Sequence, residues 1–138
     1  MKTENCQCGN LKTKGSTQCM ECYSRRLSGG ESAFNAVWND YVQQSRRRRL
    51  EWLLTKDDAR KLFGGSCFYC GASPSVVKTI PNGQGFFVFN GLDRKDNTRG
   101  YDRDNCVSCC TVCNFMKRAM SVDDFLNHIH RIASVHVP

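Results

Sequence analysis

The sequence predicts a small α+β fold that is stapled by zinc. All ten cysteines of the 138-residue chain fall into closely spaced pairs, and 24% of the residues are charged. Short apolar runs bounded by turn residues alternate with stretches in which apolar residues recur every three or four positions, as strands and helices require. These observations favour small metal-bound modules over one large hydrophobic core.

We interpret the cysteines as zinc ligands and not as disulfides. No apolar signal stretch follows Met1, and CxxC pairs are metal spacing more often than disulfide spacing in an intracellular chain. We therefore expect an intracellular protein of the cytoplasm, nucleoid or nucleus. Zinc would contribute to folding, because a structural site supplies about 10 kcal/mol of apparent binding free energy.

The charge balance predicts a polyanionic partner. The chain has 20 Lys and Arg against 13 Asp and Glu, for a formal net charge of +7. No apolar run is long enough to cross a membrane. The basic residues are clustered and occur beside the cysteine modules, which favours nucleic acid over a merely solvated face.

Residues 1–30 are predicted to form an N-terminal zinc module. Two close pairs, a CxC and a CxxC, bracket a short loop, as in zinc ribbons and knuckles. The four ligands would be Cys6, Cys8, Cys19 and Cys22. Four thiolates close a tetrahedral site and leave no position for a substrate water, so this metal would be structural. A redox site is the alternative.

Residues 31–63 are predicted to be a basic helical segment. Apolar residues recur at helical spacing from Glu31 to about Leu54, which favours one long amphipathic helix. Thr55 then caps a second, short helix that ends before Gly64. The long helix carries a run of arginines that cannot all be buried, and they lie either across a phosphate backbone or in solvent. These are Arg46, Arg47, Arg48 and Arg49.

Residues 64–138 are predicted to hold a second cysteine quartet. Cys67 and Cys70 form a knuckle that presents two thiolates and needs a distant partner pair. Two CxxC pairs follow, so spacing alone leaves the partner pair open. The candidates are Cys106 with Cys109 and Cys110 with Cys113.

The same region predicts strands, loops and helices in a defined order. Strands are expected at Val76–Ile80 and Phe86–Asn90, followed by Asp93 and a polar loop. A helix begins beside the last CxxC, and another begins at Ser121. The last helix is expected to be scaffold, with the apolar stripe Val122, Phe125, Leu126, Ile129 and Ile132.

Five motifs together resemble the HNH (His-Me finger, ββα-metal) endonucleases that contain structural zinc. They are Cys67-x-x-Cys70, Leu92-Asp93-Arg94, Gly100-Tyr101, Asn105 and Cys110-x-x-Cys113-Asn114-x-x-Lys117. The resemblance covers roughly Cys67 to Ile132, and a rare-cutting member of the family also has an extra N-terminal cysteine quartet. It implies a ββα-metal nuclease core with an N-terminal four-cysteine zinc module and flanking helices.

The resemblance also implies which cysteines bind zinc and which residues serve the reaction. Cys110 and Cys113 would complete the second zinc site, which leaves Cys106 and Cys109 as packed thiols. Asp93 and the side-chain oxygen of Asn114 would hold a catalytic divalent ion, Mg²⁺ by its preference for oxygen ligands. Asn105 would brace the loop through backbone hydrogen bonds. Lys117 and the arginine run would contact DNA phosphates.

The chain departs from the family pattern at the residue after Asp93. The expected histidine is Arg94, and no histidine occurs between Met1 and Asn127. In a member that lacks this histidine a tyrosine activates water, and the matching residue here is Tyr101. A phenol is a poor base at neutral pH because its reference pKa is about 10, so it would need a cation nearby. Arg94 would supply that cation or bind the scissile phosphate.

The histidines of the last helix are not expected to replace the missing one. His128 and His130 are two positions apart and lie on different helix faces, so they do not form a metal pair. We expect them on the surface.

The leading hypothesis is a metal-dependent DNA endonuclease that hydrolyses phosphodiester bonds in duplex DNA. It would be site-specific, restriction-like and homodimeric, with two structural zinc ions and one magnesium ion per chain. A homing or nicking enzyme is the alternative within the class. A non-catalytic zinc-dependent nucleic-acid-binding protein is the alternative outside it, and a zinc-mediated protein-interaction module is a third hypothesis.

Overall fold

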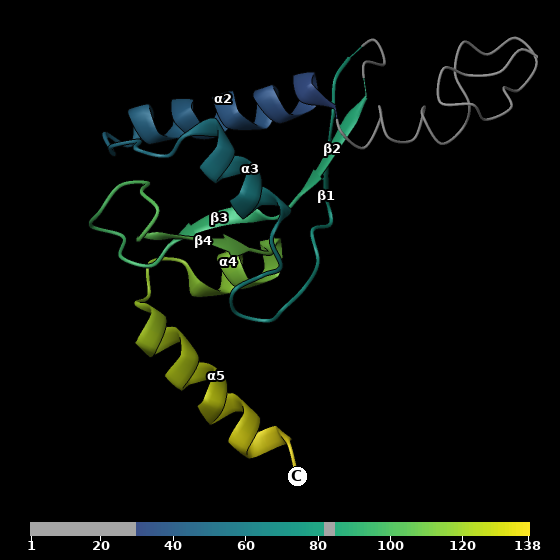
Figure 1. Cartoon of the computed structure of the whole chain (residues 1–138). Helices are drawn as coiled ribbons and strands as arrows, with labels where there is room; N and C mark the ends of the chain where they lie inside the picture. The colour runs from purple at the N-terminus through teal and green to yellow at the C-terminus, as the bar shows by residue number, and fades with distance from the viewer. Residues whose placement is uncertain (1–29, 82–84) are drawn as a thin grey trace, which may run out of the picture. The chain divides into compact units, whose positions relative to one another are not determined.

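The computed structural model describes residues 30–81 and 85–138 (Figure 1). The predicted N-terminal quartet of Cys6, Cys8, Cys19 and Cys22 lies outside these residues. The described elements are α2 (Glu31–Arg47), α3 (Lys56–Gly64), β1 (Val76–Thr79), β2 (Phe86–Phe89), β3 (Gly91–Arg94), β4 (Cys106–Cys109), α4 (Thr111–Lys117) and α5 (Val122–His136). Strands β1 and β2 form one two-stranded sheet and β3 and β4 another, which confirms the α+β class.

The chain divides into two compact units. One comprises Met1–Val37 with Val77–Phe87, and the other comprises Trp38–Val76 with Val88–Pro138. In the described part of the first unit, the ring of Phe34 packs edge-on against Phe87 at a centroid distance of 5.5 Å. The second unit contains the motifs that resemble a nuclease site. The predicted domain boundaries at residues 30 and 63 stay a prediction.

The helix predicted from Glu31 to about Leu54 is shorter than expected. α2 ends at Arg47, and Arg49 adopts the left-handed φ of 58°. The chain then turns into an extended segment that brings Leu54 into the core, where it is 5% exposed.

Backbone pairing with a distant loop explains why the helix stops. Tyr101 donates its N–H to the carbonyl of Glu51, and the N–H of Leu53 donates to the carbonyl of Tyr101, both at 2.8 Å. The ring of Trp52 packs against Trp38 and Tyr101, at centroid distances of 5.1 and 5.0 Å. The backbone groups of residues 51–53 therefore bond to the loop that carries Tyr101 instead of continuing the helix.

The β3–β4 ribbon lies between α3 and α4 (Figure 1). The strands are antiparallel, with Asp93 opposite Val107. The sequence placed Asp93 beyond a strand that ends at Asn90, whereas the structure places it within a strand of its own. Asn90 separates β2 from β3 because its buried amide nitrogen donates to the carbonyls of Gly65 and Ala72, at 2.9 and 3.0 Å.

α3 begins at the predicted cap. The Thr55 hydroxyl accepts the N–H of Asp58 at 3.1 Å, and the Asp58 carboxylate accepts the N–H of Thr55 at 3.0 Å. The other oxygen of Asp58 pairs with Arg103 at 2.7 Å. The bond from Arg103, together with those from Thr55, lowers the pKa of Asp58 from 3.8 to about 2. Asp58, which completes the capping box, thus also links α3 to the loop between β3 and β4.

α4 and α5 also begin where the sequence predicts. Cys110 caps α4, with its Sγ accepting the N–H of Cys113 at 3.4 Å. Ser121 caps α5, with its hydroxyl accepting the N–H of Asp124 at 3.1 Å. The local capping signals therefore set the starts of both helices.

The predicted apolar stripe of α5 is only partly buried. Phe125 packs inside at 3% exposure, against the ring of Tyr69, whereas Ile132 is 44% exposed. The start of the helix therefore packs against the segment that carries Tyr69. Among the residues that the structure describes, no helix combines the length and apolar character needed to span a membrane.

We expect Gly100→Ala to destabilise the protein by about 1–3 kcal/mol, the range for overpacking in a filled site. A Cβ at Gly100 would overlap the backbone carbonyl of Glu51, and backbone cannot rotate away. Urea unfolding at neutral pH with zinc present measures the effect. Gly64→Ala is the control, because a Cβ at this helical position meets nothing within 4 Å. It should be neutral or stabilising by about 0.5–1 kcal/mol. Equal stabilities of the two variants would contradict the steric argument.

Candidate functional site

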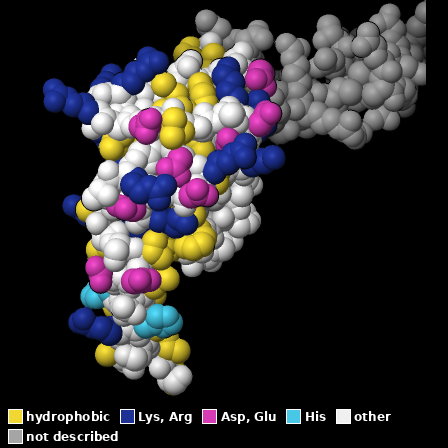
Figure 2. All heavy atoms as spheres, turned by 60° about the vertical axis from the view of Figure 1, so that its left-hand side comes forward, with side chains coloured by type: hydrophobic (Ala, Val, Ile, Leu, Met, Phe, Trp, Pro, Cys, Tyr) yellow, Lys and Arg dark blue, Asp and Glu magenta, His cyan; other side chains and the backbone are white. Residues whose placement is uncertain are grey.

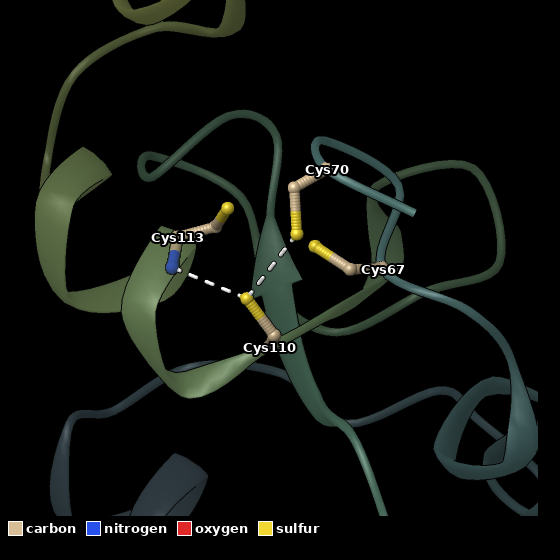
Figure 3. A group of neighbouring side chains, drawn as sticks. All are labelled: Cys67, Cys70, Cys110 and Cys113. Atoms are coloured by element: carbon tan, nitrogen blue, oxygen red, sulfur yellow. Dashed lines mark hydrogen bonds between the residues drawn. The ribbon is translucent and has the colours of Figure 1, made fainter. Parts of the chain in front are cut away.

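Four cysteines converge in the second unit (Figure 3). The sulfur atoms of Cys67, Cys70, Cys110 and Cys113 all lie within 4.8 Å of one another, and those of Cys70 and Cys110 are 3.6 Å apart. Thiolates about 2.3 Å from a tetrahedral zinc ion would lie roughly 3.8 Å apart. The cluster could therefore hold a metal ion, and it contains the four residues that the family resemblance selects.

The thiols of the cluster differ in acidity. Burial alone raises the pKa of Cys67, but hydrogen bonds from the backbone of Cys110, Cys70 and Tyr69 outweigh it and lower the pKa to about 6. Burial instead raises the pKa of Cys113 well above its ordinary value. Position separates the cluster from Cys106, which is buried at 3% exposure and lies outside the four converging sulfur atoms.

A cavity of about 320 Å³ lies beside β3 and α4. Four residues selected from the sequence line it together, namely Asp93, Arg94, Tyr101 and Asn114. Tyr41, Gln44, Arg48 and Arg118 also line the cavity. Of these four, Arg48 belongs to the arginine run that was predicted to contact DNA phosphates. No local motif marks Tyr41, Gln44 or Arg118 as part of the site.

Asp93 is buried and engaged by two donors. The hydroxyl of Tyr69 donates to Oδ2 at 2.6 Å. The ammonium of Lys117 lies 3.2 Å from Oδ2 and 3.4 Å from Oδ1. Asp93 is 4% exposed and Lys117 is 0% exposed, so this is an interior ion pair. Burial, and then the hydrogen bond to Asp93, raise the pKa of Tyr69 far above its ordinary value, so its hydroxyl stays a donor.

The position of Lys117 differs from the expected phosphate contact. Its ammonium also donates to the carbonyl of Arg94 at 3.3 Å and has no exposed surface that a DNA backbone could reach. An unpaired buried carboxylate is costly, and the lysine one turn beyond Asn114 neutralises it. The structure therefore assigns Lys117 to the interior of the site.

Asn114 and Tyr41 are fixed against β3. The side-chain nitrogen of Asn114 donates to the carbonyl of Leu92 at 3.3 Å, and the N–H of Leu92 donates to the Tyr41 hydroxyl at 3.1 Å. Gly91 makes this approach possible, since a Cβ there would lie 2.8 Å from the Tyr41 hydroxyl. The backbone of β3 thus orients side chains from both α4 and α2.

Arg94 and Tyr101 both line the cavity and contact each other. The guanidinium carbon of Arg94 lies 5.4 Å from the centre of the Tyr101 ring. Arg94 also donates to the carbonyls of Asn97 and Arg99, at 2.8 and 2.6 Å. The cation is therefore held over the tyrosine by the loop itself.

Asn105 braces this loop, as predicted. Its side-chain oxygen accepts the N–H of Asp96 at 2.9 Å. Its side-chain nitrogen donates to the carbonyls of Asp96 and Gly100, at 3.0 and 2.9 Å. Asn105 is 1% exposed, and all three bonds go to backbone, so its contribution is to the shape of the loop.

The arginine run and the histidines are on the surface. Arg46, Arg47, Arg48 and Arg49 are all exposed. Of these, Arg48 lines the cavity. His128, His130 and His136 are exposed on α5, as expected. On the face in Figure 2, Lys and Arg side chains are interspersed with Asp and Glu and form no continuous basic surface. A phosphate contact on this face would therefore rest on separate basic side chains.

Comparison with known proteins agrees with the predicted family resemblance in fold. No family model matches the chain. An uncharacterized protein of Acanthamoeba polyphaga mimivirus is 34% identical over 97 residues, which are 67% of this chain and only 16% of that protein. Among solved structures, the chain is similar to the rare-cutting HNH restriction endonuclease PacI, with a TM-score of 0.52 and 21% identity, over 95% of this chain and 94% of that one. The chain therefore has an HNH-nuclease-like fold.

Lys117→Met should lower the free energy of unfolding by about 3–5 kcal/mol, because it leaves the buried Asp93 carboxylate without its countercharge. Urea denaturation with zinc present measures this difference. Lys61→Met is the matched control, since Lys61 is exposed on α3 and its loss should change stability by no more than about 0.5 kcal/mol. A loss below about 1 kcal/mol for Lys117→Met would contradict the buried ion pair.

Proposed function

We propose that this protein is a metal-dependent DNA endonuclease that hydrolyses phosphodiester bonds. The observation that carries the proposal is the cavity beside β3 and α4, where Asp93, Arg94, Tyr101 and Asn114 meet on an HNH-like fold. These residues supply an oxygen-rich cation site, a guanidinium and a phenol. This is the chemistry that a phosphodiester requires: charge stabilisation, phosphate binding and an activated water.

The cysteine cluster would hold structural zinc. Four thiolates fill a tetrahedral shell, so no position is left for a reacting water. Its place beside α4 suits a staple that fixes the helix carrying Asn114. The N-terminal quartet would hold a second structural zinc.

The residues present also fit a catalytic Mg²⁺. Asp93 and Asn114 offer hard oxygen atoms, and a carboxylate has about four acceptor sites, which the bonds from Tyr69 and Lys117 do not exhaust. When bound, such an ion would stabilise negative charge on the scissile phosphate and on the departing 3′ oxygen. Asn114 is oriented for this role because its nitrogen bonds to Leu92.

Tyr101 would take the proton of the attacking water, and Arg94 would assist it. Tyr101 would have to be a phenolate to accept this proton, which returns it to the phenol, and the guanidinium of Arg94 over the ring is the cation that would favour the phenolate form. Arg94 would also contact the scissile phosphate, because its side chain lines the same cavity.

Duplex DNA would bind across the cavity. Arg48 and Arg118 lie at its lining and are exposed, so they can reach phosphates beside the scissile bond, and Arg46, Arg47 and Arg49 would extend this contact. A small protomer offers limited contact to a duplex. We therefore propose that the protein acts as a homodimer on a specific DNA site with two-fold symmetry. It would then be a restriction endonuclease that acts inside the cell.

The direct test is incubation of the purified chain with a large sequenced DNA, with Mg²⁺ or with EDTA, followed by mapping of the ends. Magnesium-dependent ends at one recurring sequence would support a site-specific enzyme. Single-strand breaks would identify a nicking enzyme. Binding without cleavage under all conditions would instead support a non-catalytic zinc-dependent nucleic-acid-binding protein.

If the four-cysteine cluster binds zinc, replacing one of its members should remove zinc, whereas replacing Cys106 outside the cluster should not. Cys70→Ser should lose about one of two zinc ions per chain and several kcal/mol of stability, because structural zinc binding contributes to folding. Metal content by mass spectrometry checks this. Cys106→Ala is the control and should keep both ions. Loss of zinc in the control, or intramolecular disulfides in place of zinc, would refute the assignment.

The tyrosine prediction isolates the proposed base. Tyr101→Phe removes only a hydroxyl, so DNA binding should persist while the cleavage rate falls by roughly 10²-fold to 10⁴-fold, as for other general bases. Single-turnover cleavage of a defined site, with the residual rate measured at several Mg²⁺ concentrations, provides the test. His128→Ala is the control and should cleave at the parental rate. Parental cleavage by Tyr101→Phe together with loss of cleavage in His128→Ala would point to a histidine as the base.

A further inference from the structure

The cysteine knuckle and the buried carboxylate of the site are joined by one side chain. Tyr69 lies between Cys67 and Cys70 in the chain, and its hydroxyl donates to Oδ2 of Asp93 at 2.6 Å. Tyr69 and Asp93 are 24 residues apart in sequence. The cysteine cluster therefore has a direct hydrogen-bonded link to the cavity.

The ring of Tyr69 is held on two sides. It packs edge-on against Phe68 at 5.1 Å and against Phe125 of α5 at 5.2 Å. Phe125 is itself buried, at 3% exposure. The hydroxyl is therefore held in place by packing as well as by its hydrogen bond.

The second donor to Asp93 is Lys117, which lies on the helix that begins at the other two cysteines of the cluster, Cys110 and Cys113. Lys117 stands four residues after Cys113 on α4, so both side chains lie on the same helix face. Cys110 caps that helix, and its sulfur is 3.6 Å from that of Cys70 on the knuckle. A metal ion in the cluster would cross-link the two elements that carry the two donors.

We propose that Tyr69 is a positioning residue that couples the cysteine cluster to Asp93. Metal in the cluster fixes the knuckle against α4, and this fixes Tyr69 and Lys117 around one carboxylate orientation. That orientation turns Asp93 toward the cavity that it shares with Asn114. The proposal rests on the proposed function, in which Asp93 holds the divalent ion. Tyr69 itself does not line that cavity.

Tyr69→Phe tests the coupling because it keeps the packed ring and removes only the hydroxyl. Groups that orient a metal ligand typically change metal affinity or activity by roughly 10-fold to 100-fold. We expect Mn²⁺, used as a probe in the absence of DNA, to bind the full-length variant more weakly by this factor. Electron paramagnetic resonance titration of free Mn²⁺ measures it. Zinc content should match that of the parent, and the variant should remain folded, with the urea midpoint lowered only by the loss of one buried hydrogen bond.

The magnesium dependence of cleavage provides the second measurement. The Mg²⁺ concentration for half-maximal rate should rise roughly 10-fold to 100-fold in Tyr69→Phe, while the rate at saturating Mg²⁺ falls much less. Val112→Ala is the matched control, because Val112 lies between the other two cysteines of the cluster. Val112 is 66% exposed and does not line the cavity, so this variant should show parental Mn²⁺ binding.

The outcomes separate this inference from the proposed function. A parent that neither binds Mn²⁺ nor cuts DNA would overturn both. An active parent with an unchanged Tyr69→Phe variant would overturn the coupling alone. Loss of zinc or of folded protein in Tyr69→Phe would assign the hydroxyl to the fold and also overturn the positioning role.

Discussion

A buried carboxylate constrains the arrangement of the whole site. Asp93 is almost inaccessible to solvent, and an ionised carboxylate in such a place needs charge-assisted partners to remain in the folded state. The chain provides them from two elements on either side of it, the cysteine knuckle and α4. Those elements can be brought together by a metal ion in the cysteine cluster. The fold of this unit and the chemistry of its cavity thus depend on the same few contacts.

The parts of the fold that the sequence predicts well are those fixed by neighbouring residues. Thr55 and Ser121 cap helices through bonds to N–H groups three positions on, and such capping signals are visible in any short window of sequence. The four converging cysteines were selected by family resemblance, because two CxxC pairs have the same spacing. Asn105 was placed by the same resemblance, and its bonds are to loop backbone within nine residues.

The features that the sequence did not predict depend on contacts between distant segments. α2 ends early because residues 51–53 pair with Tyr101, some fifty positions along the chain. No sequence motif marks Tyr69 as part of the site, and Lys117 was expected to contact a DNA phosphate. Their partnership with Asp93 appears only when the knuckle, β3 and α4 are in place. Periodicity and motif spacing contain no information about such a meeting.

Arg118 is the C-cap residue of α4, and its backbone has a φ of 50°. Residues other than glycine rarely adopt this left-handed conformation. A glycine at this position would relieve that backbone strain. The arginine instead reaches the cavity lining and lies 4.9 Å from the ring centre of the exposed Phe115. Helix α4 therefore ends in a residue that does not favour the backbone conformation it adopts there. Consensus or stability-guided design that introduced glycine here would relax the helix end and remove a cation from the lining of the cavity.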